Sequence, residues 1–194
     1  MISSAIQSLA QTTSPIVYFL TGHFERDILG GSYRTGYGRL NAELSRDNID
    51  VRPLVLEREK RVPEDCDALI IAGADRKIGD PERDKIASYL NASGRLLVLI
   101  DPETTIGLES LIEEWGIILS QDIVVGAFVN NSGDVVVTKY GNHPITRALK
   151  GAVTTFPMPR SIEPSEAATE NTAADQPRVS ILAITDGYAE KNLK

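Results

Sequence analysis

The sequence predicts an α/β domain with an open, mostly parallel sheet and helices on both faces. Short, wholly apolar runs of the kind found in strands buried on both faces alternate with segments of helical periodicity as far as Trp115. The first run, Ile16–Leu20, breaks at once into Gly22, His23 and Glu25, which is typical of a sheet that forms a ligand crevice. Beyond Gly116 the apolar runs shorten, and the pattern predicts a small β-rich C-terminal extension.

Each element of the sheet has its own signal. Pro53 lacks a backbone N–H and therefore predicts an edge position for its strand. Asp80 is the expected N-cap of a helix that starts at Pro81, and Gly94 is the expected left-handed residue after that helix. The expected strands are Ile16–Leu20, Val51–Leu56, Ala68–Ala72 and Leu96–Ile100, and the expected helices are Tyr37–Arg46, residues 81–90 and Leu108–Trp115.

The remaining segments have weaker patterns. Residues 1–14 are expected to be a lead-in helix or linker, residues 15–157 the α/β domain, residues 158–178 a flexible loop, and residues 179–194 a strand and tail. Within the extension we expect a turn at Asn130–Gly133, a helical turn at His143–Ile145, and strands at Asp122–Val125, Phe128–Val129, Val135–Tyr140 and Val179–Ile184.

Composition excludes several classes of protein. With 194 residues and 42% hydrophobic content the chain can bury a sizeable core, and its net charge of −7 argues against binding nucleic acid or anionic lipid. A single cysteine, Cys66, excludes an intramolecular disulfide and a thiolate metal cluster, and we expect it to be a core residue. The longest apolar run, Leu96–Ile100, is far below the roughly 18 residues of a membrane span, and the start is not that of a signal peptide.

No known catalytic or cofactor motif is complete. Gly31–Gly36 has the spacing of a P-loop, but Tyr37-Gly38 follows where Lys and Ser/Thr are needed, and Asn41 replaces the third glycine of a dinucleotide fingerprint. A metal site of His23, Glu25 and Asp27 is the less favoured interpretation of that loop. We therefore expect no cofactor and no metal.

Six residues nevertheless form a candidate ligand-binding rim. The carboxyl ends of parallel strands meet at one edge of a sheet, so polar residues after three strands are expected to lie together. Asp101 could pair with His23 for acid–base chemistry or cap the turn beside Pro102, whereas Trp115 and His143 are expected to be packing and turn residues. The candidate rim residues are Gly22, His23, Glu25, Gly73, Asp75 and Asp101.

The ordered set of segments resembles the extracytoplasmic domain of auxiliary subunits of ABC-type uncharacterised transport systems, of the gliding-motility GldG type. A Ser93-Gly94 pair stands where Gly-Gly is common, and Asp186–Tyr188 stands where a Ser-rich segment is usual. The segments that carry the likeness are Ser4–Leu9, Val17–Glu25, Val62–Gly73, Ile86–Leu90, Gly94–Pro102, Leu111–Gly116, His143–Ile145, Phe156 and Ile181–Thr185.

The resemblance implies a flavodoxin-like or class I glutamine-amidotransferase-like fold without the catalytic cysteine. It also implies a non-catalytic sensing or scaffold domain outside the cytoplasmic membrane, held by anchors absent from this chain. The related intraflagellar transport fifty-two type uses such a domain for assembly. Implied partners are ABC membrane and ATPase subunits, and a protein or glycan ligand, but no nucleic acid. Two alternatives stay open: a small hydrolase or amidotransferase-like enzyme using His23, Glu25 and Asp101, and a cytoplasmic binder of a phosphate-bearing cofactor.

Overall fold

The structure is a computed structural model that divides into two compact units. It describes residues 14–30, 36–125, 134–166, 168, 178–185 and 188–190. The first unit is Met1–Ile100 with Thr105–Gly107, and the second is Asp101–Thr104 with Leu108–Lys194. The predicted α/β domain at residues 15–157 thus extends over both units.

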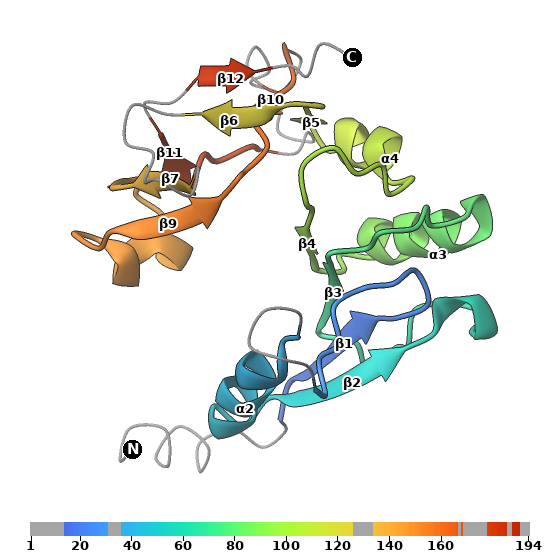
Figure 1. The fold of residues 1–194 in the computed structure, drawn as a ribbon. Coiled ribbons are helices and arrows are strands. Elements are labelled where there is room, and N and C mark those ends of the chain that lie inside the picture. The colour runs from blue at the N-terminus through green and yellow to red at the C-terminus, as the bar shows by residue number, and fades with distance from the viewer. Residues whose placement is uncertain are drawn as a thin grey trace. The chain divides into compact units, whose positions relative to one another are not determined.

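A four-stranded parallel sheet forms the centre of the first unit, in the order β2-β1-β3-β4 (Figure 1). The strands are β1 (Ile16–Leu20), β2 (Asp50–Leu54), β3 (Ala68–Ala72) and β4 (Leu96–Leu99). Pro53 lies opposite Phe19 in the outermost strand β2, so its missing N–H removes no bond inside the sheet. The predicted α/β fold class and the edge position of Pro53 are confirmed.

The helices of the first unit follow from these connections. Helix α2 (Gly38–Arg46) links β1 to β2, α3 (Asp80–Asn91) links β3 to β4, and a short 3₁₀ helix, η1 (Leu56–Arg58), follows β2. The β1–β2 connection leads toward one edge of the sheet, and the β3–β4 connection leads toward the opposite edge. Because parallel crossovers are right-handed, α2 and α3 cover opposite faces.

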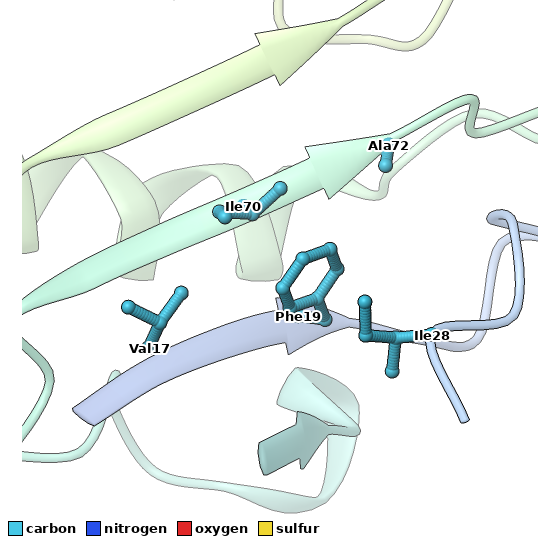
Figure 2. Close-up of a cluster of buried hydrophobic side chains, with 5 residues drawn as sticks. All are labelled: Val17, Phe19, Ile28, Ile70 and Ala72. Carbon is cyan, nitrogen blue, oxygen red and sulfur yellow. The ribbon is translucent and has the colours of Figure 1, made fainter. Parts of the chain in front are cut away.

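Alternation along β1 and β3 buries side chains on both faces of the sheet. Figure 2 shows the cluster on one face, formed by Val17, Phe19, Ile28, Ile70 and Ala72. Leu40 and Leu44 of α2 pack against this cluster. The residues between them in β1 and β3 point to the other face and are also buried: Tyr18, Leu20, Leu69 and Ile71. Burial of each large aliphatic side chain contributes about 1.5–3 kcal/mol, so the apolar runs identified in the sequence stabilise this unit.

The second unit is built from short antiparallel pieces, which confirms the predicted β-rich extension. It begins with α4 (Glu109–Glu114), and a 3₁₀ helix, η2 (Pro144–Leu149), falls at the expected helical turn. Its strands form the pairs β5 (Ile117–Leu119) with β10 (Ile162–Pro164), β6 (Ile123–Val125) with β12 (Tyr188–Glu190), β7 (Asp134–Val137) with β9 (Thr154–Pro157), and β8 (Lys139–Tyr140) with β11 (Ala183–Ile184).

Two buried charged residues, Arg160 and Asp122, form hydrogen bonds to loops of the second unit. The Arg160 guanidinium donates through Nε to the Ser120 carbonyl at 2.9 Å and through Nη1 to the Thr104 carbonyl at 3.2 Å. Asp122 accepts from the backbone N–H and hydroxyl of Ser161, at 2.8 and 2.6 Å. Burial lowers the pKa of Arg160. These bonds satisfy backbone carbonyl and N–H groups that lie outside the strands.

Several local predictions were wrong. Asp80 is the first residue of α3 rather than its cap; the N-cap is Gly79, and the Asp80 carboxylate pairs with Arg83 at 2.8 Å. The left-handed residue after α3 is Ser93, with φ of 67°, and not Gly94. The segment expected to be a flexible loop, residues 158–178, contains β10, and β12 follows the strand that was expected to be last.

Other predictions fall outside the described residues. These are the lead-in at residues 1–13, the strand Phe128–Val129 and the turn Asn130–Gly133. Within the part of the chain that the structure describes, no helix has both the length and the hydropathy needed to cross a bilayer.

Gly94 is required by the close approach of Tyr89. A Cβ at position 94 would lie 2.5 Å from the Tyr89 ring. The ring cannot move away easily, because its hydroxyl donates to the Arg95 carbonyl at 3.2 Å and accepts from the Arg95 N–H at 3.1 Å. The ring, and not a left-handed backbone, therefore explains this glycine.

We predict that Gly94→Ala destabilises the protein by about 1–3 kcal/mol through overpacking against Tyr89. Gly38→Ala is the matched control, because Gly38 opens α2 and a Cβ there meets only the Gly30 carbonyl at 3.4 Å. Alanine favours the helix, so the control should be neutral or stabilising. Urea unfolding curves measure both variants, and equal stabilities would contradict the steric explanation.

Candidate functional site

The loop after β1 is held at the carboxyl edge of the sheet by a glycine and by backbone bonds. Gly22 has a φ of 129°, which an L side chain rarely adopts, and it turns the chain so that His23 points inward, with only 7% of the residue exposed. The His23 carbonyl accepts hydrogen bonds from the N–H groups of Asp75 and Arg76, both at 3.0 Å. The loops after β1 and β3 are therefore joined through the backbone.

The His23 ring lies between two carboxylates. Its Nδ1 is 3.1 Å from Oε1 of Glu25, and its Nε2 is 2.9 Å from Oε2 of Glu82 in the first turn of α3. Oε2 of Glu25 also accepts from the His23 backbone N–H at 2.7 Å. The carboxylate side chains are 2% and 10% exposed, respectively. This buried triad connects the loop after β1 to the helix that follows β3.

The carboxyl groups of the triad depend on the His23 ring for their hydrogen bonds. A carboxylate oxygen only accepts, so both ring nitrogens must carry hydrogen for both contacts to be hydrogen bonds with carboxylates. With a neutral ring, one of the two contacts is a hydrogen bond only if that carboxyl group carries the proton and donates it to the ring nitrogen. Oε1 of Glu82 is buried and has no hydrogen-bond partner among the described residues. The imidazole of His23 is thus the partner on which the Glu82 carboxyl group depends.

The triad occupies a characteristic place in this topology. From β1 the chain moves to β2 on one side, and it later enters β3 on the other side of β1. The strand order therefore reverses between β1 and β3, and ligands of open α/β sheets bind outside the carboxyl ends of the strands at such a point. His23 and Asp75 follow these two strands, which places the predicted rim at the reversal.

The structure brings together five of the six predicted rim residues. Gly73 has a φ of 64°, and a Cβ there would lie 2.9 Å from the Arg26 side chain. The backbone N–H of Arg26 donates to the Ala72 carbonyl at 2.9 Å. Asp75 is exposed beside it. The sixth residue, Asp101, is assigned to the second unit, where its carbonyl accepts from the Thr104 hydroxyl at 2.7 Å. The five that share the first unit's edge are Gly22, His23, Glu25, Gly73 and Asp75.

Sequence reasoning missed Glu82. It lies 59 residues from His23, in the first turn of a helix for which only Asp80 and Pro81 were singled out in the sequence. The predicted topology could have indicated it. In a parallel sheet, the loop after β3 and the start of α3 lie at the same carboxyl edge as the loop after β1. An acidic residue in that first turn could therefore have been listed as a partner for the histidine.

The other reactive side chains are committed to local roles. Asp27 accepts from the Leu29 N–H at 2.9 Å, and His143 accepts through Nδ1 from the Ile145 N–H at 3.3 Å, as expected for a turn residue. Within the residues that the structure describes, no group of three or more His, Cys, Asp and Glu side chains is arranged to hold a metal ion. Cys66 precedes β3, at the end of the sheet opposite the rim, and its thiol lies 3.5 Å from the Tyr89 hydroxyl. Burial raises the pKa of the Cys66 thiol.

We predict that His23→Ala lowers the free energy of unfolding by about 3–5 kcal/mol, because it leaves two buried carboxyl groups without the hydrogen-bond partner that they share. Glu82→Gln should cost less, since the amide oxygen can still accept from Nε2. His143→Ala, at the half-buried histidine of the η2 turn, is the control and should cost under about 1 kcal/mol. Thermal and urea unfolding measure all three, and a His23→Ala protein as stable as the control would contradict the structural role of the triad.

We also predict that Cys66 reacts slowly with iodoacetamide in the folded protein. A raised pKa leaves less thiolate at a given pH, and the thiolate is the nucleophile. The pH at which labelling reaches half its maximal rate should therefore be higher in the folded protein than in the same protein in urea. Mass spectrometry at short times gives both rates, and a lower midpoint for the folded protein would contradict the effect of burial.

Comparisons with known proteins agree with this architecture. The N-terminal domain of mmIFT52 superimposes with a TM-score of 0.61 at 20% sequence identity, over 86% of this chain and 72% of that one, which shows a shared fold. None of the curated proteins matches the chain. The family described as "ABC-type uncharacterized transport system" matches residues 14–173. Because this match covers most of the sequence, the chain belongs to the auxiliary family of ABC-type uncharacterized transport systems.

Proposed function

We propose that the chain is a non-catalytic, extracytoplasmic sensing or scaffold domain of an ABC transporter auxiliary subunit of the gliding-motility type. Membership of the family supports association with an ABC transport system. The domain would bind a partner protein or an extracellular ligand through the edge that carries Gly22, His23, Glu25, Gly73 and Asp75. Contact with the membrane and ATPase subunits would be indirect, through anchors that flank a domain of this kind.

The observation that carries this proposal is the engagement of both His23 ring nitrogens by carboxylates inside the protein. A general base needs a nitrogen within hydrogen-bond reach of the proton it removes. His23 is buried and its two nitrogens face Glu25 and Glu82. The other histidine, His143, accepts from a backbone N–H in a turn. The arrangement favours binding over the alternative of a hydrolase or amidotransferase-like enzyme, which would need His23 as a free acid–base group.

Catalysis is tested directly. We predict that the purified chain hydrolyses no ester, amide or glycoside substrate above the rate in buffer. His23→Ala is compared with His143→Ala, each assayed below its own unfolding temperature. A turnover that disappears in the His23 variant and persists in the His143 variant would overturn the proposal in favour of the enzyme.

Location and association are tested with the natural full-length protein in its own cell. Alkaline phosphatase fused after Lys194 should be active, because that reporter needs an oxidising compartment for its disulfides. The tagged protein should co-purify with the ABC subunits encoded beside it. An inactive fusion would contradict the extracytoplasmic location, and the absence of those subunits from the purified material would contradict the scaffold role.

A further inference from the structure

Phe24 is an exposed aromatic residue in a strained conformation. Its φ is 60°, in the left-handed region that bulky side chains rarely adopt, and 67% of the residue is exposed. The conformation is imposed by its neighbours, because Gly22 turns the chain and His23 is fixed in the buried triad. Strain of this kind persists only where the surroundings hold it, and it gathers at functional sites. The fold gains little apolar burial from a ring placed in solvent.

Arg76 stacks on this ring. Its guanidinium carbon lies 4.5 Å from the Phe24 ring centroid, and its backbone N–H bonds the His23 carbonyl at 3.0 Å. Among the residues that the structure describes, the guanidinium has no hydrogen bond or ion pair. The donors therefore stay available, on a side chain whose orientation is held by the aromatic ring.

The chemistry of this pair selects a carboxylate. A planar guanidinium matches a carboxylate with two parallel N–H···O bonds, and the apolar ring beside it accepts an apolar neighbour. Polyanions fit poorly because the chain carries a net charge of −7, and because the exposed carboxylate of Asp75 lies next to Arg76 in the chain. A single Asp or Glu side chain beside an apolar residue, as found in a protein segment, meets both conditions.

We infer that the Phe24–Arg76 pair is a docking point for a protein segment that presents an acidic side chain next to an apolar one. The inference rests on the proposed function and specifies the partner that the edge of the sheet accepts. Arg76 binds the carboxylate, and Phe24 supplies the apolar contact while it holds the guanidinium. Aromatic and arginine anchors of this kind dominate the energetics of protein interfaces.

The test uses the full-length protein in its native cell, with a photo-crosslinking phenylalanine derivative at position 24. The same derivative at Leu97, an exposed residue of β4, is the matched control. We expect a crosslink from position 24, and not from position 97, to a protein segment that holds an Asp or Glu within a few residues of the attachment point. Arg76→Ala should lower the yield about tenfold, the scale of a lost charge-assisted bond. Arg76→Glu combined with Asp/Glu→Lys in the partner should restore it.

A stability measurement separates docking from a structural role. Phe24→Gly should leave the unfolding temperature of the purified chain unchanged or raise it, since glycine adopts the left-handed region freely, while it weakens co-purification with the partner. A lowered unfolding temperature with unchanged co-purification would overturn the inference.

The crosslinks also separate this inference from the proposed function. Crosslinks from position 24 only to lipid or glycan, or none while the ABC subunits still co-purify, would overturn the inference and leave the proposed function standing. Absence of the ABC subunits altogether would overturn both.

Discussion

The buried histidine between two carboxylates is the interaction on which the edge of the first unit depends. Glu25 lies two residues from His23, whereas Glu82 lies in a helix that follows a different strand. The triad therefore converts two separate loops into one rigid rim, and the backbone bonds from Asp75 and Arg76 to His23 reinforce it. A buried ion network adds little net stability compared with apolar residues, but breaking it is expensive. Its contribution is to fix the position of the loops.

This rigidity has a consequence for function. In open α/β domains the reversal of strand order leaves room for a ligand above the sheet. Here side chains of the protein itself occupy the carboxyl ends of β1 and β3, with His23 and Glu25 directed inward. The features that remain outside include the ring of Phe24, the cation of Arg76 and the carboxylate of Asp75. Such a surface is suited to recognition, in agreement with a family defined by its association with transport systems.

The sequence predicted the first unit well and the second only in outline. Runs such as Ala68–Ala72 have no polar residue, so burial on both faces could be inferred, and Pro53 marked the edge. The strands of the second unit have two to four residues, which is too short for an alternating pattern to be recognised in the sequence. Their partners also lie far away in the chain, as for β6 and β12. At the site, Gly22, His23 and Glu25 form one continuous signal. Glu82 could not be found in the same way, because only the folded topology brings it to Nε2 of His23.

The composition of β2 also decides how copies of this domain can associate. Its edge position exposes one side of the strand, where Pro53 offers no N–H and Asp50 pairs with Arg52 at 2.6 Å. A proline and a charged pair on an outer strand prevent the regular ladder that an added strand needs. Polymerisation by continued strand addition is thereby blocked on this flank. A domain present at high local concentration thereby gains protection from fibre formation on this flank.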